Sequence, residues 1–433
     1  MSRERIDLSQ DDIPRAWYNI LPDLPESLPS YKDVESGKEI RRLPNTFTKT
    51  ASELEFSEKR WNKIPEKVLE AYKNLGRPLP LIRARRLERF LKTPARIYFK
   101  CENLPPGGTF KINASLPQAY WAMKEGYKRT VFGGTATTRT KLIHAFTARV
   151  FGLTPTIFMT RADCEQNRDQ VIFLREMFGA DLLESPSNRT ETGRRLLKEN
   201  PNHPGSSDII GMEVEEETRQ SEDGVSIISS DLNSNLLTQT VIGLEVKKQL
   251  ELIDEKPDVL VASVGSGSNF YGLTAPFMKE RLTKLKDLKF LAVESETSAK
   301  LTKGEYKYVP LEWMPGLLVK TYEFGWETHP PPIKGIGIQT KCAAPLLSFL
   351  RHLGIVDTAV YPKDERFVFD TARIFLQTEG RLLAPESAYP IRAVMDEAIE
   401  AKRKGEEKVI VVCVSGTLYL DFDEKERYTS LAI

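Results

Sequence analysis

Residues 94–116, PARIYFKCENLPPGGTFKINASL, predict one complete strand, turn and helix of an α/β fold. Ile97–Lys100 is rich in β-branched and aromatic residues, as strands are, and the turn at 105–108 separates it from a segment of helical spacing. We expect that helix to begin near Thr109 and to continue to Ala122. This stretch indicates a chain in which strands alternate with helices.

The same stretch places Lys111 in the first turn of the expected helix. The helix dipole disfavours a cation at that end, and the apolar neighbours Phe110 and Ile112 limit its contact with water. Both effects lower the pKa of a lysine, which then suits Schiff-base chemistry. The alternative is a solvated lysine whose stem covers apolar surface.

After Gly76 the alternation of short apolar runs with helical segments continues along the chain. The predicted strands are Ile97–Lys100, Thr130–Phe132, Thr156–Met159, Ser226–Ser229, Val259–Val264, Lys289–Val293 and Val409–Val414. The predicted helices include Glu165–Phe178, Leu236–Leu252 and Phe270–Leu282. This order predicts the α/β class, with parallel sheets that helices cover on both faces.

The predicted units divide the chain near residue 235. Residues 1–75 form an N-terminal extended arm and lead-in, and the first 60 of them, rich in proline and charge, are expected to lie on the surface. Residues 76–235 form an N-terminal α/β domain that carries Lys111, and residues 236–433 form a C-terminal α/β domain. Residues 304–339 are expected to be loops near the mouth of a cleft.

The charge balance favours a small-molecule or protein partner. The 433 residues include 62 basic and 61 acidic side chains, so no strong field attracts nucleic acid or an anionic membrane. The N-terminal segment MSRERIDLSQDD has no apolar core of a signal peptide, and no apolar run reaches the roughly 18 residues that a membrane span needs.

The cysteines and histidines do not predict a metal site. The four cysteines have no CxxC spacing and are expected to be buried thiols of a cytoplasmic protein: Cys101, Cys164, Cys342 and Cys413. None of the four histidines is paired at metal-ligand spacing, so we do not expect a zinc enzyme.

A second stretch with chemical potential is DVLVASVGSGSNFYGL, residues 258–273. A buried strand ends at Val264, and the small residues 265–269 lead into a helix whose N-terminus favours a phosphate. A dinucleotide site is the alternative, because Glu294 at the end of the next strand could bind a ribose. The glycine spacing does not match the dinucleotide fingerprint, so we favour phosphate alone.

The third stretch is KVIVVCVSGTLYL, residues 408–420. A strongly apolar strand ends at Val414 and brings Ser415 to the edge of the sheet where α/β proteins bind ligands. A serine that only caps a turn is the alternative.

Together the three stretches fit pyridoxal phosphate (PLP). Lys111 would bind its aldehyde, the segment 265–269 its phosphate and Ser415 its ring nitrogen. A neutral serine leaves that nitrogen unprotonated, which favours β-elimination and β-replacement over transamination.

These residues resemble the β chain of tryptophan synthase, and specifically its second subgroup. The resemblance covers nearly the whole chain and is carried by WYNILPDLP, GRPLPLIRARRLERFLKTPARIYFKCENLPPGGTFKIN, QTVIGLEVKKQL, VGSGSNFYG, PPPI and EGRLLAPESAYPIRAV. It implies a two-domain, fold-type II PLP architecture with a mobile subdomain at about 126–215. It also implies a dimer, often paired with an α subunit that makes indole.

The resemblance also assigns roles to residues. Lys111 would be the Schiff-base lysine, Asn113 the neighbour of the ring oxygen, Glu386 a residue beside the ring and Ser415 the partner of its nitrogen. The phosphate cradle would consist of Gly265, Ser266, Gly267, Ser268 and Asn269. The loop that holds the substrate carboxylate would consist of Thr135, Ala136, Thr137, Thr138 and Arg139.

Several positions depart from the family pattern. Phe110 stands where the family has a histidine, and Gly134 stands where it has the glutamate that serves as acid-base catalyst. Gln339-Thr340-Lys341 and Thr417-Leu418 also replace more polar family residues. The departures imply a degenerate paralogue with an intact cofactor site and impaired proton transfer.

The first hypothesis for function is PLP-dependent β-replacement that joins serine or O-phosphoserine to indole to give L-tryptophan. Arg139 and Lys141 would favour phosphoserine, because phosphate leaves without the missing acid. The second hypothesis is an inactive or weak paralogue that acts as a structural or allosteric partner of an active β chain or an α subunit. The third, a dinucleotide-binding oxidoreductase, leaves Lys111 unexplained.

Overall fold

A seven-stranded sheet lies at the centre of the computed structural model, which describes residues 4–134, 138–228, 231–283, 287–311, 314–325 and 333–419. Its strands, in spatial order, are β1 (Arg5–Ile6), β6 (Leu81–Arg83), β7 (Arg96–Lys100), β17 (Val409–Cys413), β12 (Val259–Ser263), β13 (Lys289–Ser295) and β16 (Asp357–Tyr361). The five strands from β7 to β16 run parallel, and β6 and β1 extend one edge, where β6 pairs antiparallel with β7 and β1 pairs antiparallel with β6.

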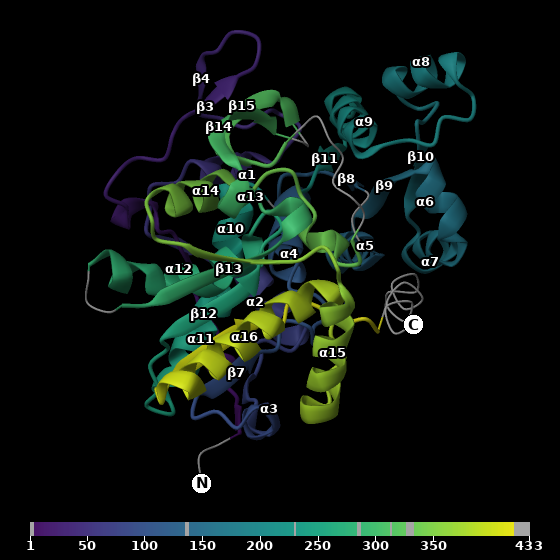
Figure 1. Ribbon diagram of the computed structural model, residues 1–433. Coiled ribbons are helices and arrows are strands. Elements are labelled where there is room, and N and C mark those ends of the chain that lie inside the picture. The colour runs from purple at the N-terminus through teal and green to yellow at the C-terminus, as the bar shows by residue number, and fades with distance from the viewer. Residues whose placement is uncertain are drawn as a thin grey trace.

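Helices cover both faces of this sheet (Figure 1). Along β17, Val409 and Val411 pack into one core, while Ile410 and Val412 pack into the other, because successive side chains of a strand point to opposite faces. The first core includes residues of α2 (Glu66–Asn74), α4 (Ile112–Lys124), α10 (Asn233–Gln239), α11 (Val241–Glu251), α12 (Ser268–Leu282) and α14 (Pro345–His352). The second includes residues of α3 (Arg85–Leu91), α15 (Arg366–Glu379) and α16 (Pro385–Lys404). The predicted parallel sheet with two covered faces is confirmed.

A separate sheet of four parallel strands lies beside the first, at the upper right of Figure 1. Its spatial order is β10 (Asp181–Ser185), β9 (Thr154–Thr160), β8 (Arg129–Gly133) and β11 (Gly224–Ser226). Its helices are α5 (Thr138–Val150), α6 (Arg161–Gln166), α7 (Arg168–Phe178), α8 (Glu191–Glu199) and α9 (Ser207–Gln220). This unit coincides with much of the expected subdomain at 126–215, whose movement stays a prediction.

The predicted boundary at residue 235 does not separate the sheets. Strands β6 and β7 precede it in sequence, yet they pair within the same sheet as β17. Residues 76–235 therefore contribute to both parallel sheets. The boundaries of the domains stay a prediction.

The N-terminal segment is part of the core, and the expectation of a surface arm is wrong. Its strands β2 (Ala16–Tyr18) and β5 (Trp61–Lys63) pair with each other, and α1 (Lys49–Glu55) lies between them in sequence. Trp17 is 1% exposed and packs edge-on against Trp121 of α4, with ring centroids 6.1 Å apart. The aromatic residues that interrupt the polar sequence are therefore anchors, because each buries a large apolar area.

The expectation of loops for residues 304–339 is wrong for the first part of that segment. Strands β14 (Glu305–Leu311) and β15 (Met314–Glu323) form an antiparallel pair, which β3 (Tyr31–Asp33) and β4 (Glu39–Ile40) extend to four strands. The apolar side chains Leu317 and Val319 pack beneath this sheet with Tyr31 of the N-terminal segment. The pairing of β15 with β3, which lies nearly 300 residues earlier in the chain, cannot be seen in a local pattern.

Three helices of the structure differ from the predicted ones in where they begin or in being broken into two. The helix expected from Thr109 begins at Ile112, and Lys111 is its N-cap residue. The helix expected at 165–178 is broken at Asn167 into α6 and α7, and the one at 236–252 is broken at Thr240 into α10 and α11. Periodicity spans such breaks, so sequence alone does not place them.

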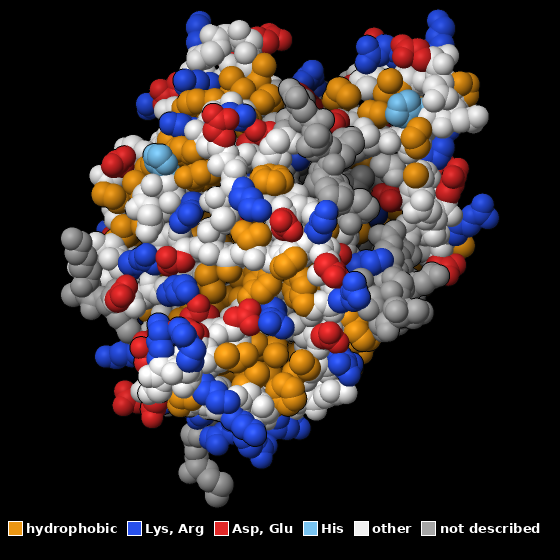
Figure 2. Space-filling view, in the orientation of Figure 1, with side chains coloured by type: hydrophobic (Ala, Val, Ile, Leu, Met, Phe, Trp, Pro, Cys, Tyr) orange, Lys and Arg blue, Asp and Glu red, His pale blue; other side chains and the backbone are white. Residues whose placement is uncertain are grey.

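The expectation of buried thiols is confirmed. All four cysteines are buried and free. In the part of the chain that the structure describes, no helix has the length and apolar character needed to cross a bilayer. Figure 2 shows acidic and basic side chains interspersed over much of one face, with Lys and Arg gathered at its lower end. Short helix α13 (Lys300–Lys303) completes the fold.

We expect Trp17→Ala to lower the free energy of unfolding by about 3–5 kcal/mol, because it removes a buried aromatic side chain from the main core. Trp61→Ala is the matched control, since Trp61 is 53% exposed and its loss should cost no more than about 0.5 kcal/mol. Urea unfolding followed by circular dichroism measures both values. Equal effects of the two substitutions would contradict a core role for the N-terminal segment.

Candidate active site

A cavity of about 1520 Å³, open solvent at its mouth included, lies where the carboxyl ends of the two parallel sheets meet. Ser263 and Ser415 come from the ends of β12 and β17 in the larger sheet. Gly133 and Ser226 come from the ends of β8 and β11 in the smaller one. Ligand sites of α/β proteins lie at such edges of parallel sheets, so this cavity is the candidate ligand site.

Lys111 lies in the wall of this cavity, on the loop that leads into α4. That loop is tied to the loop after β17, because Phe110 N–H donates to the carbonyl of Ser415 (3.2 Å) and Thr417 N–H donates to the carbonyl of Gly108 (3.0 Å). These two hydrogen bonds bring together residues about 300 positions apart in sequence. They place Lys111 and Ser415 on the same side of the site.

Burial lowers the pKa of Lys111 to about 8, and the nearby Arg139 guanidinium adds to the lowering. The carboxylates of Glu386 and Asp231 oppose it. Among the side chains that the structure describes, none forms a hydrogen bond or ion pair with the Lys111 ammonium. A fraction of this amine is therefore neutral near physiological pH, and the neutral amine is the nucleophile.

The segment 265–269 forms a cradle at the N-terminus of α12, and all five residues line the cavity. Gly267 is its N-cap, with a φ of 102° that favours glycine. A side chain at Gly265 is also excluded, since its Cβ would lie 2.5 Å from the carbonyl oxygen of Gly337. Backbone N–H groups therefore face the cavity at the positive end of a helix of 15 residues.

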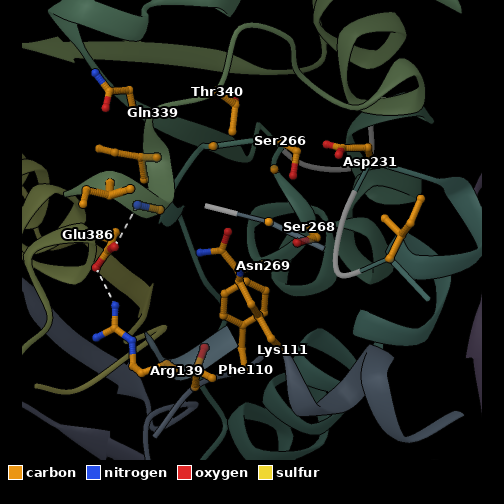
Figure 3. Close-up of a pocket in the computed structure, with 18 of the residues that line it drawn as sticks. Phe110, Lys111, Arg139, Asp231, Ser266, Ser268, Asn269, Gln339, Thr340 and Glu386 are labelled. Carbon is orange, nitrogen blue, oxygen red and sulfur yellow. Dashed lines mark hydrogen bonds and ion pairs between the residues drawn. The ribbon is translucent and has the colours of Figure 1, made fainter. Parts of the chain in front are cut away.

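An unpartnered donor shows that the cradle suits an anion. Asn269 is 5% exposed, and its Nδ2 has no hydrogen-bond partner among the described residues. A buried donor without a partner costs free energy that an oxygen-rich ligand would recover. Figure 3 shows Lys111 and the cradle residues Ser266, Ser268 and Asn269 around one space. The arrangement fits a group with an aldehyde and a phosphate, as pyridoxal phosphate has.

Glu386, in the first turn of α16, is held by two donors. Arg139 Nη2 donates to Oε2 (3.0 Å), and Gly337 N–H donates to Oε1 (2.9 Å), as the dashed lines of Figure 3 show. Arg139 also donates through Nη1 to the carbonyl of Thr417 (2.8 Å). Because each carboxylate oxygen accepts a hydrogen bond and one forms an ion pair, the orientation of the Glu386 carboxylate is fixed.

Ser415 occupies the predicted strand-end position and lines the cavity. Its Oγ lies 3.0 Å from Ser387 Oγ, and Gly416 N–H donates to that same Ser387 hydroxyl (3.0 Å). Ser387 follows Glu386 on α16. The same helix therefore carries Glu386 and, through Ser387, contacts Ser415, the two residues expected beside the ring.

Asn113 does not line the cavity. It is fully buried on α4, where its amide accepts from Arg77 (3.0 Å) and donates to Glu102 (3.0 Å) and Gln239 (3.1 Å). This network with two charged groups uses its hydrogen-bonding capacity, so its side chain faces away from the expected ligand. Its assigned contact with the ring oxygen stays a prediction.

The expected carboxylate loop is only partly described. Thr135, Ala136 and Thr137 lie outside the described residues, and Thr138 is known only as the first residue of α5. Arg139 lines the cavity, but Lys141 does not, since it is buried 3.8 Å from Asp163. Glu294, considered as a ribose ligand, is also buried away from the cavity and accepts from the N–H groups of Leu301 and Thr302.

Sequence reasoning missed Asp231, which lines the cavity and interacts electrostatically with Lys111. Its φ of 74° lies in the left-handed region, which is uncommon outside glycine and is concentrated at functional sites. The only signal in the sequence is one acidic residue after the apolar strand, in the run IISSDL. In the described lining, Asp231 and Glu386 are the carboxylates.

Comparison with known proteins shows which family the chain resembles. The family described as "Pyridoxal-phosphate dependent enzyme" matches residues 72–416. A tryptophan synthase β chain of Pyrococcus horikoshii is 45% identical, over 97% of this chain and 91% of its own. A tryptophan synthase β chain 2 of Pyrococcus furiosus is 43% identical, over 98% of this chain and 95% of its own.

A solved structure confirms the predicted fold class. Threonine deaminase isoform 2 of Solanum lycopersicum superposes with a TM-score of 0.59, at 14% identity, over 94% of this chain and 98% of its own. At this level of identity the likeness concerns the fold alone, which is that of the fold-type II PLP enzymes.

The lowered pKa of Lys111 predicts how the amine reacts with pyridoxal phosphate. The rate at which the cofactor-free protein develops a visible absorbance band should rise with pH and level off above a pKa of about 8, because only the neutral amine attacks the aldehyde. An ordinary lysine, with a pKa of about 10.4, would show a rate that still rises at pH 9–10. Stopped-flow absorbance measures the profile, and Lys111→Ala, which should give no band, is the control.

Proposed function

We propose a function for this chain from its membership of the pyridoxal-phosphate dependent enzyme family and, within that family, of the tryptophan synthase β chains. It joins serine or O-phosphoserine to indole by β-replacement and releases L-tryptophan. The protein acts in the cytoplasm as a homodimer, or as a mixed dimer with an active β chain, and an α subunit that makes indole is a further partner.

One observation carries this proposal: a lysine with a lowered pKa faces a helix-borne anion cradle across a cavity at the edge of a parallel sheet. Lys111 would bind the aldehyde of the cofactor, the segment 265–269 its phosphate and Ser415 its ring nitrogen. When bound, the cofactor withdraws electrons from the α-carbon of the amino acid and so makes its proton acidic.

The side chains around the bound cofactor would then have separate roles. Lys111 Nζ accepts the α-proton of the donor, since its pKa of about 8 allows it to be neutral beforehand. The fixed carboxylate of Glu386 and its partner Arg139 set the charge beside the ring. The uncharged Ser415 leaves the ring nitrogen without a proton, and this directs the reaction towards replacement at the β-carbon.

The departure of the leaving group is the step that Gly134 impairs. The bond from the β-carbon to oxygen breaks, and a bond from that carbon to C3 of indole forms. Hydroxide leaves well only if an acid protonates it, whereas phosphate needs no proton. With no carboxylate at residue 134, we propose Asp231 as the proton donor for serine and the acceptor of the indole proton. Arg139 would favour O-phosphoserine by its charge.

The alternative function is that of an inactive or weak paralogue that serves as a structural or allosteric partner. The observation in its favour is the pair Phe110 and Gly134, both of which line the cavity and neither of which can transfer a proton. Native mass spectrometry after co-expression with an active β chain tests this alternative: homodimers alone count against it, whereas a mixed dimer without turnover of either amino-acid donor supports it.

The proposed activity predicts a visible absorbance band in the purified protein that shifts when O-phosphoserine is added, and tryptophan when indole follows. A band that no amino acid shifts would favour the structural alternative. A protein without a band, even when pyridoxal phosphate is supplied, would refute the role of Lys111.

Arg139→Ala should lower turnover of O-phosphoserine more than that of serine. An equal loss of turnover with the two donors would show that Arg139 does not select between them.

Asp231→Asn should lower kcat with serine by about 10²–10⁴-fold, the usual range for loss of an acid-base group. The loss with O-phosphoserine should be smaller, since its leaving group needs no proton. Asp254→Asn is the matched control, because Asp254 also has a positive φ (51°) but is exposed and does not line the cavity. Equal losses with the two donors would show that Asp231 does not protonate the leaving group.

A further inference from the structure

Lys300 is a fully buried lysine that the proposed reaction does not use. It is the first residue of α13, it is 0% exposed, and it does not line the cavity. Its ammonium donates to the carbonyl oxygens of Ser298 (3.0 Å) and Val264 (3.2 Å) and to the hydroxyl of Ser298 (3.3 Å). The three oxygens match the three donors of an ammonium group, which are hard to satisfy inside a protein.

The charge of Lys300 is balanced by Glu294, whose Oε1 lies 3.8 Å from Nζ. Glu294 is equally buried, and its other hydrogen bonds come from Leu301 N–H (2.9 Å), Thr302 N–H (3.1 Å) and Thr302 Oγ1 (2.8 Å). Burial lowers the pKa of Lys300, while Glu294, Cys342 and Asp231 oppose that lowering. The oxygen ligands and the carboxylate together favour a cation at this position.

The oxygens around Lys300 belong to the elements that build the cofactor site. Val264 directly precedes the cradle residue Gly265. Ser298 Oγ donates to the carbonyl of Thr340 (2.7 Å) and accepts from Thr340 N–H (3.2 Å), and Thr340 lines the cavity. One ammonium thus connects the residue before the cradle with the loop at Thr340, which also lines the cavity.

We propose that Lys300 is a positioning residue that acts as a tethered monovalent cation and holds the phosphate cradle in register with the cavity loop at Thr340. Carbonyl and hydroxyl oxygens at about 3 Å form the kind of shell that replaces the water around K⁺ or NH₄⁺. The protein therefore carries this charge as part of its chain and is independent of a dissolved cation. The link to cofactor binding rests on the cradle described under the proposed function.

Removing the charge should open this site to a free ion. Lys300→Met keeps most of the length of the side chain but leaves the oxygens without their donor. In tetramethylammonium chloride, whose cation is too large for the site, the variant should bind pyridoxal phosphate about 10–100-fold more weakly, the usual cost of losing a supporting partner. Ammonium or potassium chloride at equal ionic strength should restore most of that affinity and raise Tm in a saturable way.

Lys303→Met is the matched control, because Lys303 lies in the same short helix, is half exposed and pairs only with Glu296 at the surface (3.7 Å). This control and the unaltered protein should bind the cofactor equally well in all three salts. Cofactor affinity is measured by absorbance titration, and Tm is measured on the cofactor-free protein.

The two readouts separate this inference from the cradle on which it rests. Recovery of Tm without any change in cofactor affinity would retain the tethered cation but refute its link to the cradle. Unchanged affinity and Tm in Lys300→Met, or equal recovery in all three salts, would overturn the inference. If the variant folds only when ammonium or potassium is present during refolding, the inference is supported, and failure to fold in every salt overturns it.

Discussion

Two backbone hydrogen bonds hold the candidate active site together. They join the loop before α4 to the loop after β17, from Phe110 N–H to the carbonyl of Ser415 and from Thr417 N–H to that of Gly108. Strand β17 lies in the middle of the larger sheet, buried between two cores, so its end is among the most rigid places in the molecule. Because the loop that carries Lys111 is hydrogen bonded to the end of that strand, the position of Lys111 is fixed as well. A lysine at a fixed position can be buried from water and still reach the cavity.

Several buried charged side chains of the protein form ion pairs with a side chain of opposite charge. Lys111 differs from them, because no described side chain forms an ion pair with it. Arg139 is paired with Glu386, and Lys300 lies beside Glu294. Behind the site, Arg77 is hydrogen bonded to both Glu102 and Glu245, and the latter also accepts from Lys100. Such pairs keep their charges because a buried ion without a partner is strongly destabilised. Among the described side chains none forms an ion pair with Lys111, and burial lowers the pKa of its amine to about 8, which leaves part of it neutral and nucleophilic.

The two carboxylates of the described cavity lining, Glu386 and Asp231, differ in their surroundings. Glu386 is fixed by Arg139 and Gly337, whereas Asp231 enters the cavity from a strained turn of the smaller sheet's last connection. A chain that lacks an acid at residue 134 can thus still offer a carboxyl group from another element. In the proposed reaction, this arrangement links the choice of amino-acid donor to the leaving group, because serine needs a proton at that step and O-phosphoserine does not.

The sequence by itself determined the fold class and the family, and it located Lys111 and the segment 265–269, which line the cavity, because each depends on local patterns. Periodicity identifies strands and helices, and a glycine-serine turn after an apolar strand identifies a helix N-terminus. Trp17 shows the limit of such patterns, since only packing against Trp121 distinguishes a core anchor from a surface arm. Tertiary structure alone turned Asn113 towards Arg77, brought Asp231 into the cavity and placed the Lys300 ammonium beneath the cradle. Those placements depend on pairings between residues far apart in the chain, and the free energy of burying a polar group is decided by the partner it meets there.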